Sequence, residues 1–169
     1  MMTSVTFKGN TIELQGSTVQ ANQAAPAFEV LNSSLEAVTL ENFKGKTVLF
    51  NIVPSLDTPV CAIQSKTFYA KLQNLPVELV TISMDLPFAQ KRFCGAENIN
   101  MQTLSDHREA NFGNNYGLLL PNLRLLTRAV LVLNAAGQIS YVEIVPEVTN
   151  EPNYEAAFKA VEAAVSTTV

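Results

Sequence analysis

The segment Pro54-Ser55-Leu56-Asp57-Thr58-Pro59-Val60-Cys61 directly follows the apolar run Val48-Leu49-Phe50-Asn51-Ile52-Val53. The run is typical of a strand buried on both faces, and the apolar residues after Cys61 recur at helical spacing. We therefore expect a strand over 47–53, a break at Pro54 and a helix from about Pro59. Cys61 then lies in the first turn of that helix, where free N–H groups and the helix dipole favour thiolate over thiol.

The residues before Cys61 support this placement. Thr58 suits the N-cap, and Pro59 suits the first helical position because the N–H that proline lacks would be unpaired there. The Thr58 hydroxyl is one helical turn before the sulfur and can donate a hydrogen bond to it. Pro54 can shield the thiol from bulk water.

Turn residues and apolar periodicity predict the other elements. Lys8-Gly9-Asn10 joins two short strands in an N-terminal hairpin, and Asp85 and Gly95 are the expected N-cap and terminator of a second helix. We expect further strands over 27–31, 37–40, 77–84, 101–105, 129–133 and 139–145, and helices over 108–116 and 153–165. The order predicts one α/β domain, residues 1–169, with a mixed sheet flanked by helices in the thioredoxin-like arrangement and an N-terminal β-hairpin.

Composition narrows the class of protein. Of the 169 residues 47% are hydrophobic and 15% charged, and the net charge is -4, which is typical of a globular domain and argues against binding to nucleic acid or an acidic membrane. We find no signal peptide and no run long enough to cross a membrane, so we expect a cytoplasmic protein. In that reducing compartment, two cysteines are more often reactive than structural.

The two cysteines occupy different kinds of position. Cys94 lies 33 residues after Cys61, directly before Gly95, where the end of a helix disfavours an anion. One interpretation is an attacking thiol at Cys61 and an ordinary resolving thiol at Cys94. The other is that Cys94 is a small buried side chain, which is common for free cysteine. The absence of a Cys-x-x-Cys motif argues against a dithiol exchanger.

Pro54, Thr58 and Cys61 match, position by position, the active-site pattern Pro-x-x-x-Thr-x-x-Cys of the peroxiredoxins. The segment Met84-Asp85-Leu86-Pro87-Phe88-Ala89-Gln90-Lys91-Arg92-Phe93-Cys94-Gly95-Ala96-Glu97 resembles the one characteristic of the bacterial thiol peroxidase subfamily, the atypical two-cysteine peroxiredoxins. The N-terminal hairpin, Arg128-Ala129-Val130 and residues 151–157 are also similar to that subfamily. The resemblance covers essentially the whole chain.

The resemblance implies a reaction cycle. The Cys61 thiolate attacks a hydroperoxide and becomes a sulfenic acid, Cys94 of the same chain condenses with it to a disulfide, and thioredoxin reduces the disulfide. No metal, haem or flavin cofactor is needed, Arg128 stabilises the thiolate and orients the peroxide, and the protein is a homodimer. Because the cysteines are expected on different helices, we also predict a rearrangement before the disulfide forms.

The chain departs from the subfamily at two positions. Pro59 stands where glycine is usual, which stiffens the loop but leaves the N–H groups of Val60 and Cys61 available to a peroxide oxygen. Asn98 stands where glycine is common, a minor difference.

Several other residues have competing interpretations. Without the resemblance, Arg128 would be taken for a surface ion-pair partner, and Arg92, near Cys94, is its rival for the catalytic role. His107 lies in a polar loop and is expected to be non-catalytic, and Asp57 is expected to face solvent or cap the helix. The apolar stretch 113–126 is either core packing, a dimer surface or the wall of a peroxide pocket.

Two alternatives to the cycle remain open from the sequence. One is a one-cysteine peroxidase in which Cys94 is incidental. The other is a thioredoxin-fold redox sensor, in which oxidation of Cys61 signals to a partner and turnover is slow.

Overall fold

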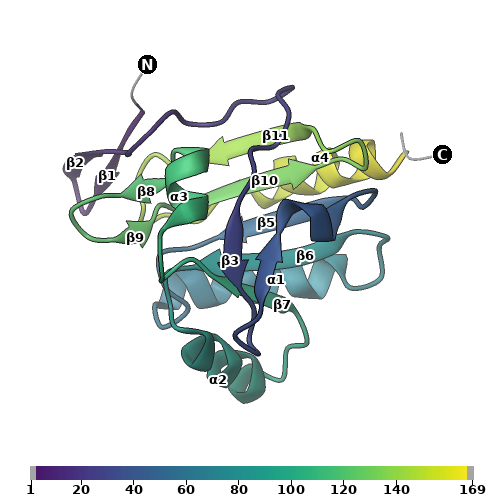
Figure 1. Ribbon diagram of the computed structural model, residues 1–169, viewed down its shortest axis with the longest axis horizontal. Helices are drawn as coiled ribbons and strands as arrows, with labels where there is room; N and C mark the ends of the chain where they lie inside the picture. Colours follow the sequence, from purple (N-terminus) through teal and green to yellow (C-terminus); the bar gives the residue numbers. More distant parts are fainter. Residues whose placement is uncertain (1–2, 167–169) are drawn as a thin grey trace.

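The computed structural model describes residues 3–166, and its centre is a seven-stranded sheet in the order β11-β10-β5-β6-β7-β3-β4 (Figure 1). These strands are β3 (Glu29–Leu31), β4 (Ala37–Thr39), β5 (Val48–Ile52), β6 (Glu78–Ser83), β7 (Gln102–Ser105), β10 (Ala129–Leu133) and β11 (Ile139–Ile144). The helices are α1 (Pro59–Leu72), α2 (Pro87–Glu97), α3 (Asn111–Tyr116) and α4 (Tyr154–Ser166), with a 3₁₀ turn at Leu40–Phe43. The predicted mixed sheet flanked by helices is confirmed.

Strands β5, β6 and β7 run parallel, and the remaining strands pair antiparallel to their neighbours. All five residues of β5 are buried, as the apolar run predicted. Since side chains alternate along a strand, Phe50 faces one side of the sheet and Leu49 the other. The central strands therefore supply apolar side chains to both faces.

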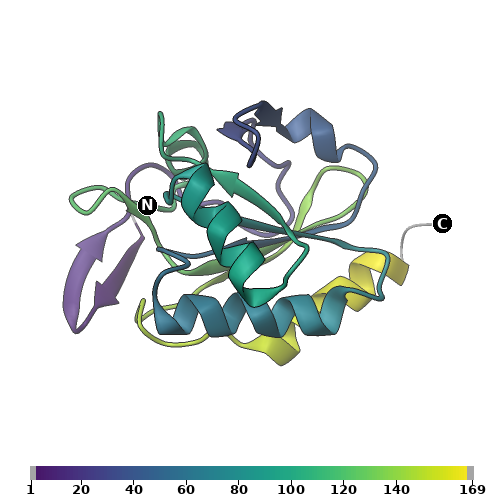
Figure 2. The ribbon, with the colours of Figure 1, turned by 90° about the horizontal axis from the view of Figure 1, so that it is seen from below.

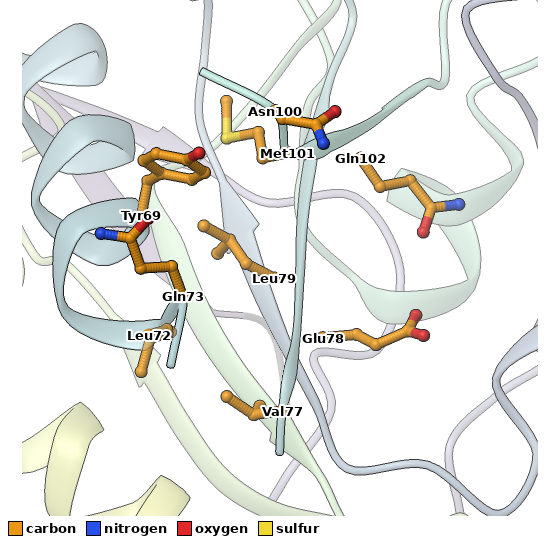
Figure 3. Close-up of a pocket in the computed structure, with 9 residues that line it drawn as sticks. All are labelled: Tyr69, Leu72, Gln73, Val77, Glu78, Leu79, Asn100, Met101 and Gln102. Atoms are coloured by element: carbon orange, nitrogen blue, oxygen red, sulfur yellow. The ribbon is translucent and has the colours of Figure 1, made fainter. Parts of the chain in front are cut away.

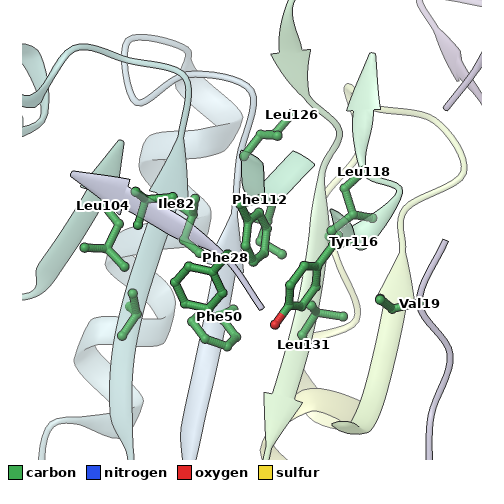
Figure 4. Packing of buried hydrophobic residues seen from close by; sticks show 14 of the residues in the cluster. Val19, Phe28, Phe50, Ile82, Leu104, Phe112, Tyr116, Leu118, Leu126 and Leu131 are labelled. Carbon is green, nitrogen blue, oxygen red and sulfur yellow. The ribbon is translucent and has the colours of Figure 1, made fainter. Parts of the chain in front are cut away.

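Helices α1 and α4 cover one face of the sheet, and α3 covers the other (Figures 1 and 2). On the α3 face, aromatic rings pack edge to face around Phe28, whose ring centroid lies 5.5 Å from that of Phe112 and 6.0 Å from that of Phe50 (Figure 4). On the other face, Phe68 of α1 packs in one cluster with Val161 of α4. Burial on both faces holds the start of α1 rigidly against the end of β5.

Two short hairpins lie outside the main sheet. The predicted N-terminal hairpin is present as β1 (Ser4–Phe7) and β2 (Asn10–Glu13), with Lys8 and Gly9 both at positive φ in the turn. A second hairpin, β8 (Leu119–Leu120) with β9 (Leu125–Leu126), was not predicted. Four leucines of this apolar stretch are buried in the core, Leu125 is partly buried and Leu123 is exposed, which favours the core-packing interpretation of residues 113–126.

The predicted ends of the second helix need correction, whereas α1 begins at Pro59 as predicted and ends at Leu72. Helix α2 has Leu86, not Asp85, as its N-cap residue, because the Asp85 carboxylate is engaged by other donors. Gly95 does not terminate α2, which continues to Glu97 and is capped by Asn98 at φ 54°. Asparagine tolerates this left-handed conformation better than most residues other than glycine, so Asn98 can end the helix.

In the part of the chain that the structure describes, no helix combines the length and the apolar character needed to cross a membrane.

Candidate active site

Cys61 lies in the first turn of α1, as predicted. Thr58 is the N-cap residue with an extended backbone, and Pro59 is the first helical residue. The first backbone bond of the helix runs from the Ala62 N–H to the Thr58 carbonyl at 3.0 Å. The N–H groups of Val60 and Cys61 therefore precede the hydrogen-bonded part of the helix, where they can serve an anion or a peroxide oxygen.

An apolar cluster surrounds the Cys61 side chain, which is completely buried. The cluster combines residues from the end of β5, the loop before α1 and the region of α2: Val53, Leu56, Phe93 and Ile99. Cys94 is half-buried and packs against the same cluster, and both cysteines are free thiols. The structure thus brings the two predicted site cysteines to one cluster, although their helices are separate.

The Cys94 thiol is in a different electrostatic setting from a helix N-terminus. Burial raises its pKa, and a hydrogen bond from the Met101 backbone N–H only partly opposes that shift. Cys94 lies in the last turn of α2, and its carbonyl accepts the Ile99 N–H at 2.9 Å. These features suit a thiol that attacks second, after another sulfur has become electrophilic.

The loop between β5 and α1 orders the residues before Cys61. Pro54 is buried, as expected of a residue that shields the site. Thr58 is exposed, and its hydroxyl donates to the Ser55 carbonyl at 2.9 Å rather than to the Cys61 sulfur. The predicted bond from Thr58 to the sulfur is therefore wrong for this conformation, because the backbone acceptor lies within reach and takes the single hydroxyl proton.

Arg128 is buried at the start of β10, which rules out the interpretation of a surface ion pair. Its Nε donates to the Val148 carbonyl at 2.6 Å and its Nη1 donates to Gln64 Oε1 at 2.9 Å. Gln64 lies three residues after Cys61 on α1 and is itself fully buried. The guanidinium is therefore held against the helix that carries the reactive cysteine.

A buried polar network continues from Gln64 into the sheet. Gln64 Nε2 donates to Asn51 Oδ1 at 2.6 Å, and Asn51 Nδ2 donates to Ser65 Oγ at 2.9 Å and Thr81 Oγ1 at 3.0 Å. Ser65 Oγ in turn donates to the Cys61 carbonyl at 2.9 Å. Buried polar groups that satisfy one another fix a single geometry, and here they fix α1 relative to β5 and β6.

Sequence reasoning missed three residues of this region: Gln64, Asn51 and Asp85. Asn51 carried a signal, since it is the one polar residue inside an apolar run. Gln64 carried a weaker one, at a spacing that places it near the buried side of α1. Asp85 was predicted to be an N-cap, because an acidic residue before a proline at the start of a helix commonly has that role. That prediction concealed its bonds to the loop before α1.

The other candidate residues lie away from the buried network. Arg92 is exposed and pairs with the exposed Asp57, with 3.2 Å between Nη2 and Oδ1. Asp57 thus faces solvent, as predicted. His107 follows β7, and its backbone N–H donates to Ser105 Oγ at 3.3 Å. The structure therefore brings Arg128, and not Arg92, into the buried interior beside α1.

A surface pocket lies next to the apolar cluster, between the C-terminal half of α1 and the first residues of β6 and β7 (Figure 3). Tyr69 and Met101 line this pocket and also pack against the cluster around Cys61. Cys61 does not line it. The pocket is thus next to the site but separated from the buried sulfur by these side chains.

Comparison with known proteins matches residues 20–158 to the redoxin family. A thiol peroxidase of Listeria monocytogenes serotype 4b is 51% identical over 161 residues, covering 94% of this chain and 98% of the relative. A thiol peroxidase of Halalkalibacterium halodurans is 49% identical over 166 residues, covering 97% of this chain and 100% of the relative. The crystal structure of a peroxiredoxin-like protein from Aquifex aeolicus superposes with a TM-score of 0.90 at 36% identity, covering 97% of this chain and 99% of that one. The chain therefore belongs to the redoxin family and, within it, to the thiol peroxidases.

Proposed function

We propose that the protein reduces hydrogen peroxide and organic hydroperoxides, with Cys61 as the attacking thiolate. The sulfur attacks one peroxide oxygen, the O–O bond breaks, and the other oxygen leaves as water or an alcohol after taking a proton. Cys61 is oxidised to a sulfenic acid. The observation that carries this proposal is the position of Cys61 at the third residue of α1, ahead of the first intrahelical hydrogen bond.

Cys94 is the resolving thiol in this proposal. Its sulfur attacks the Cys61 sulfenic acid, an S–S bond forms, and the sulfenic oxygen leaves as water. Thioredoxin then supplies two electrons by thiol–disulfide exchange and restores both thiols. The packing of Cys94 against the cluster that encloses Cys61 supports this role.

Arg128, Thr58 and Pro54 complete the proposed site. The guanidinium of Arg128 lies against α1 through Gln64 and supplies positive charge for the thiolate and the departing oxygen. Thr58 occupies the N-cap position, and its hydroxyl can turn from the Ser55 carbonyl to the peroxide when substrate enters. Pro54 excludes water behind the sulfur.

The test is a coupled assay with thioredoxin, thioredoxin reductase and NADPH. We expect sustained NADPH oxidation by the wild-type protein, none by Cys61→Ser, and loss of thioredoxin-dependent recycling in Cys94→Ser. Recycling of Cys94→Ser at the wild-type rate would identify a one-cysteine peroxidase. Oxidation of Cys61 without sustained turnover would identify a redox sensor.

We also propose that the protein is a cytoplasmic homodimer. Light scattering coupled to size-exclusion chromatography tests the dimer, for which a mass of twice 18.4 kDa is expected. Fractionation of the source cells tests the location.

A further inference from the structure

Asp85, two residues before α2, holds the loop that leads to Cys61. Its Oδ1 accepts a hydrogen bond from Ser55 Oγ at 2.7 Å, and its Oδ2 accepts the Leu56 N–H at 2.8 Å. Ser83 Oγ donates to the same Oδ2 at 2.8 Å. Bonds to a carboxylate are stronger than neutral ones, so three of them make Asp85 a firm attachment point.

The attachment reaches the start of α1 through Ser55. The Ser55 hydroxyl accepts the Asp57 N–H at 3.1 Å, and its carbonyl accepts the Thr58 N–H at 3.2 Å and the Thr58 hydroxyl at 2.9 Å. Thr58 is the N-cap residue of the helix that carries Cys61. Fixing Ser55 therefore fixes the first turn of α1, including the N–H groups beside the sulfur.

The attachment reaches Cys94 through α2. Gln90, one turn before Cys94, is fully buried and donates from Nε2 to Ser83 Oγ at 3.0 Å and to the Leu104 carbonyl at 2.8 Å. Its Oε1 is buried without a partner among residues 3–166. Only Pro87 and Phe93 are buried apolar residues of α2, so polar contacts hold much of this helix in place.

We propose that Asp85 is a positioning residue that sets the balance between the two steps of the reaction. Its bonds hold the Cys61 loop and α2 together in the arrangement that attacks peroxide. Because Asp85 joins the Cys61 loop to the start of α2, separation of these two segments requires that the bonds to Ser55 and Leu56 break. This inference rests on the proposed roles of the two cysteines.

The two steps are therefore expected to respond in opposite directions. Asp85→Ala should lower the rate constant for oxidation of Cys61 by hydrogen peroxide about tenfold and raise the rate of disulfide formation about tenfold, the size expected for losing charge-assisted bonds. Asp85→Asn keeps one acceptor oxygen and should fall between wild type and Asp85→Ala in both rates. Ser55→Ala should reproduce part of the effect and be non-additive with Asp85→Ala.

The measurement is rapid chemical quench after mixing reduced protein with hydrogen peroxide. Dimedone traps the sulfenic acid, N-ethylmaleimide traps remaining thiols, and intact mass spectrometry counts sulfenic acid and disulfide at each time. Glu97→Gln is the matched control, since Glu97 pairs with Lys66 at 3.2 Å and so joins α2 to α1 at the surface. Val161→Ala, in the distant α4 cluster, controls for general loss of stability.

The wild-type trace is read first, because it tests the proposed function alone: without a sulfenic acid that converts to a disulfide, the roles of the cysteines are wrong. If wild type does cycle, opposite shifts in the Asp85 variants but not in the controls support the inference. Unchanged rates, shifts in the same direction, or shifts equal to those of Val161→Ala overturn it. If Asp85→Ala does not fold, the two rates are compared instead for Asp85→Asn and Ser55→Ala against the same controls.

Discussion

Gln64 and the Val148 carbonyl together position the guanidinium of Arg128. Gln64 accepts from Arg128 through its carbonyl oxygen and donates to Asn51 through its amide nitrogen, so both ends of one side chain are used. The sequence pattern places Cys61 at the start of a helix, and the family resemblance points to Arg128. They do not identify Gln64, since a glutamine in a helix is ordinary until its burial is known.

Replacing Gln64 should impair both stability and the oxidation of Cys61. Gln64→Leu leaves Arg128 Nη1 and Asn51 Oδ1 without their partner in a buried region, which costs about 1–3 kcal/mol. The rate constant with hydrogen peroxide should fall as Arg128 loses its position. Urea unfolding and single-turnover oxidation measure the two effects.

Gln73→Leu is the matched control, because Gln73 is exposed just after α1 and should change either quantity little. Equal behaviour of the two leucine variants would show that the buried network does not hold Arg128.

The raised pKa of Cys94 makes the second step dependent on pH. Since the thiolate is the nucleophile and a thiol with a raised pKa is mostly protonated at neutral pH, the rate of disulfide formation should rise about tenfold per pH unit below that pKa. The lifetime of the sulfenic acid, measured by dimedone trapping between pH 6.5 and 8.5, checks this. A lifetime independent of pH would mean that deprotonation of Cys94 does not limit the step.

At the scale of elements, α2 differs most from expectation. Its sequence contains an acidic residue before a proline and a glycine after Cys94, which are ordinary signals for the two ends of a helix. The structure uses neither: Asp85 binds the loop before α1, and Asn98 provides the cap. Local signals describe what a residue can do within its own segment, and here a neighbouring segment competes for Asp85.

Glu147 helps to attach the N-terminal hairpin to the domain, alongside the backbone bonds of Thr6 with Pro146 and Val148. The Thr149 N–H and hydroxyl, and then the Gly9 N–H, lower the pKa of Glu147 to about 2. Because the folded-state pKa lies below the usual glutamate pKa of 4.5, this contribution to stability is present above about pH 4.5 and is lost as the pH falls towards 2.

Glu147→Gln should therefore loosen the hairpin at neutral pH. Amide hydrogen exchange of β1 and β2 should become faster in the variant, while exchange in β5 and β6 stays unchanged. Acidification of the wild-type protein from pH 5 to 3 should lower the protection factors of the same amides, but less than Glu147→Gln does, because the pH stays above the folded-state pKa of Glu147. If the hairpin amides exchange at the same rate in both proteins, the Glu147 bonds do not hold it.

At the scale of the whole molecule, the sheet separates two apolar clusters, and the site lies at the edge between them. On the α3 side Phe112 and Tyr116 stack at a centroid distance of 4.2 Å, and on the α1 and α4 side Phe68 packs edge to face against Tyr154 and Phe158 among aliphatic residues. The polar network of Asn51 crosses the α1 side, where it replaces apolar packing. The free energy of folding thus comes mainly from the two apolar clusters, whereas the polar network of Asn51 fixes the geometry around Cys61.

Truncating the aromatic cluster should destabilise the entire domain. Phe50→Ala removes a ring that contacts Phe28, Phe43 and Phe112, and should lower the free energy of unfolding by about 3–5 kcal/mol. Phe88→Ala is the control, because Phe88 is 66% exposed on α2 and its loss should change stability by about 0.5 kcal/mol or less. Urea unfolding followed by circular dichroism measures both, and similar midpoints would contradict the assignment of the core.

The sequence by itself determined the order of the main elements and the placement of Cys61 in the first turn of α1, because apolar periodicity, proline and the N-cap threonine act locally. The family pattern pointed to Arg128 and Cys94. Only the tertiary structure decided that Arg128 is buried against Gln64, that residues 113–126 form part of the core, and that Asp85 joins the two cysteine segments. These contacts join residues as many as 64 positions apart. A local pattern carries no information about which distant donor lies within hydrogen-bond reach.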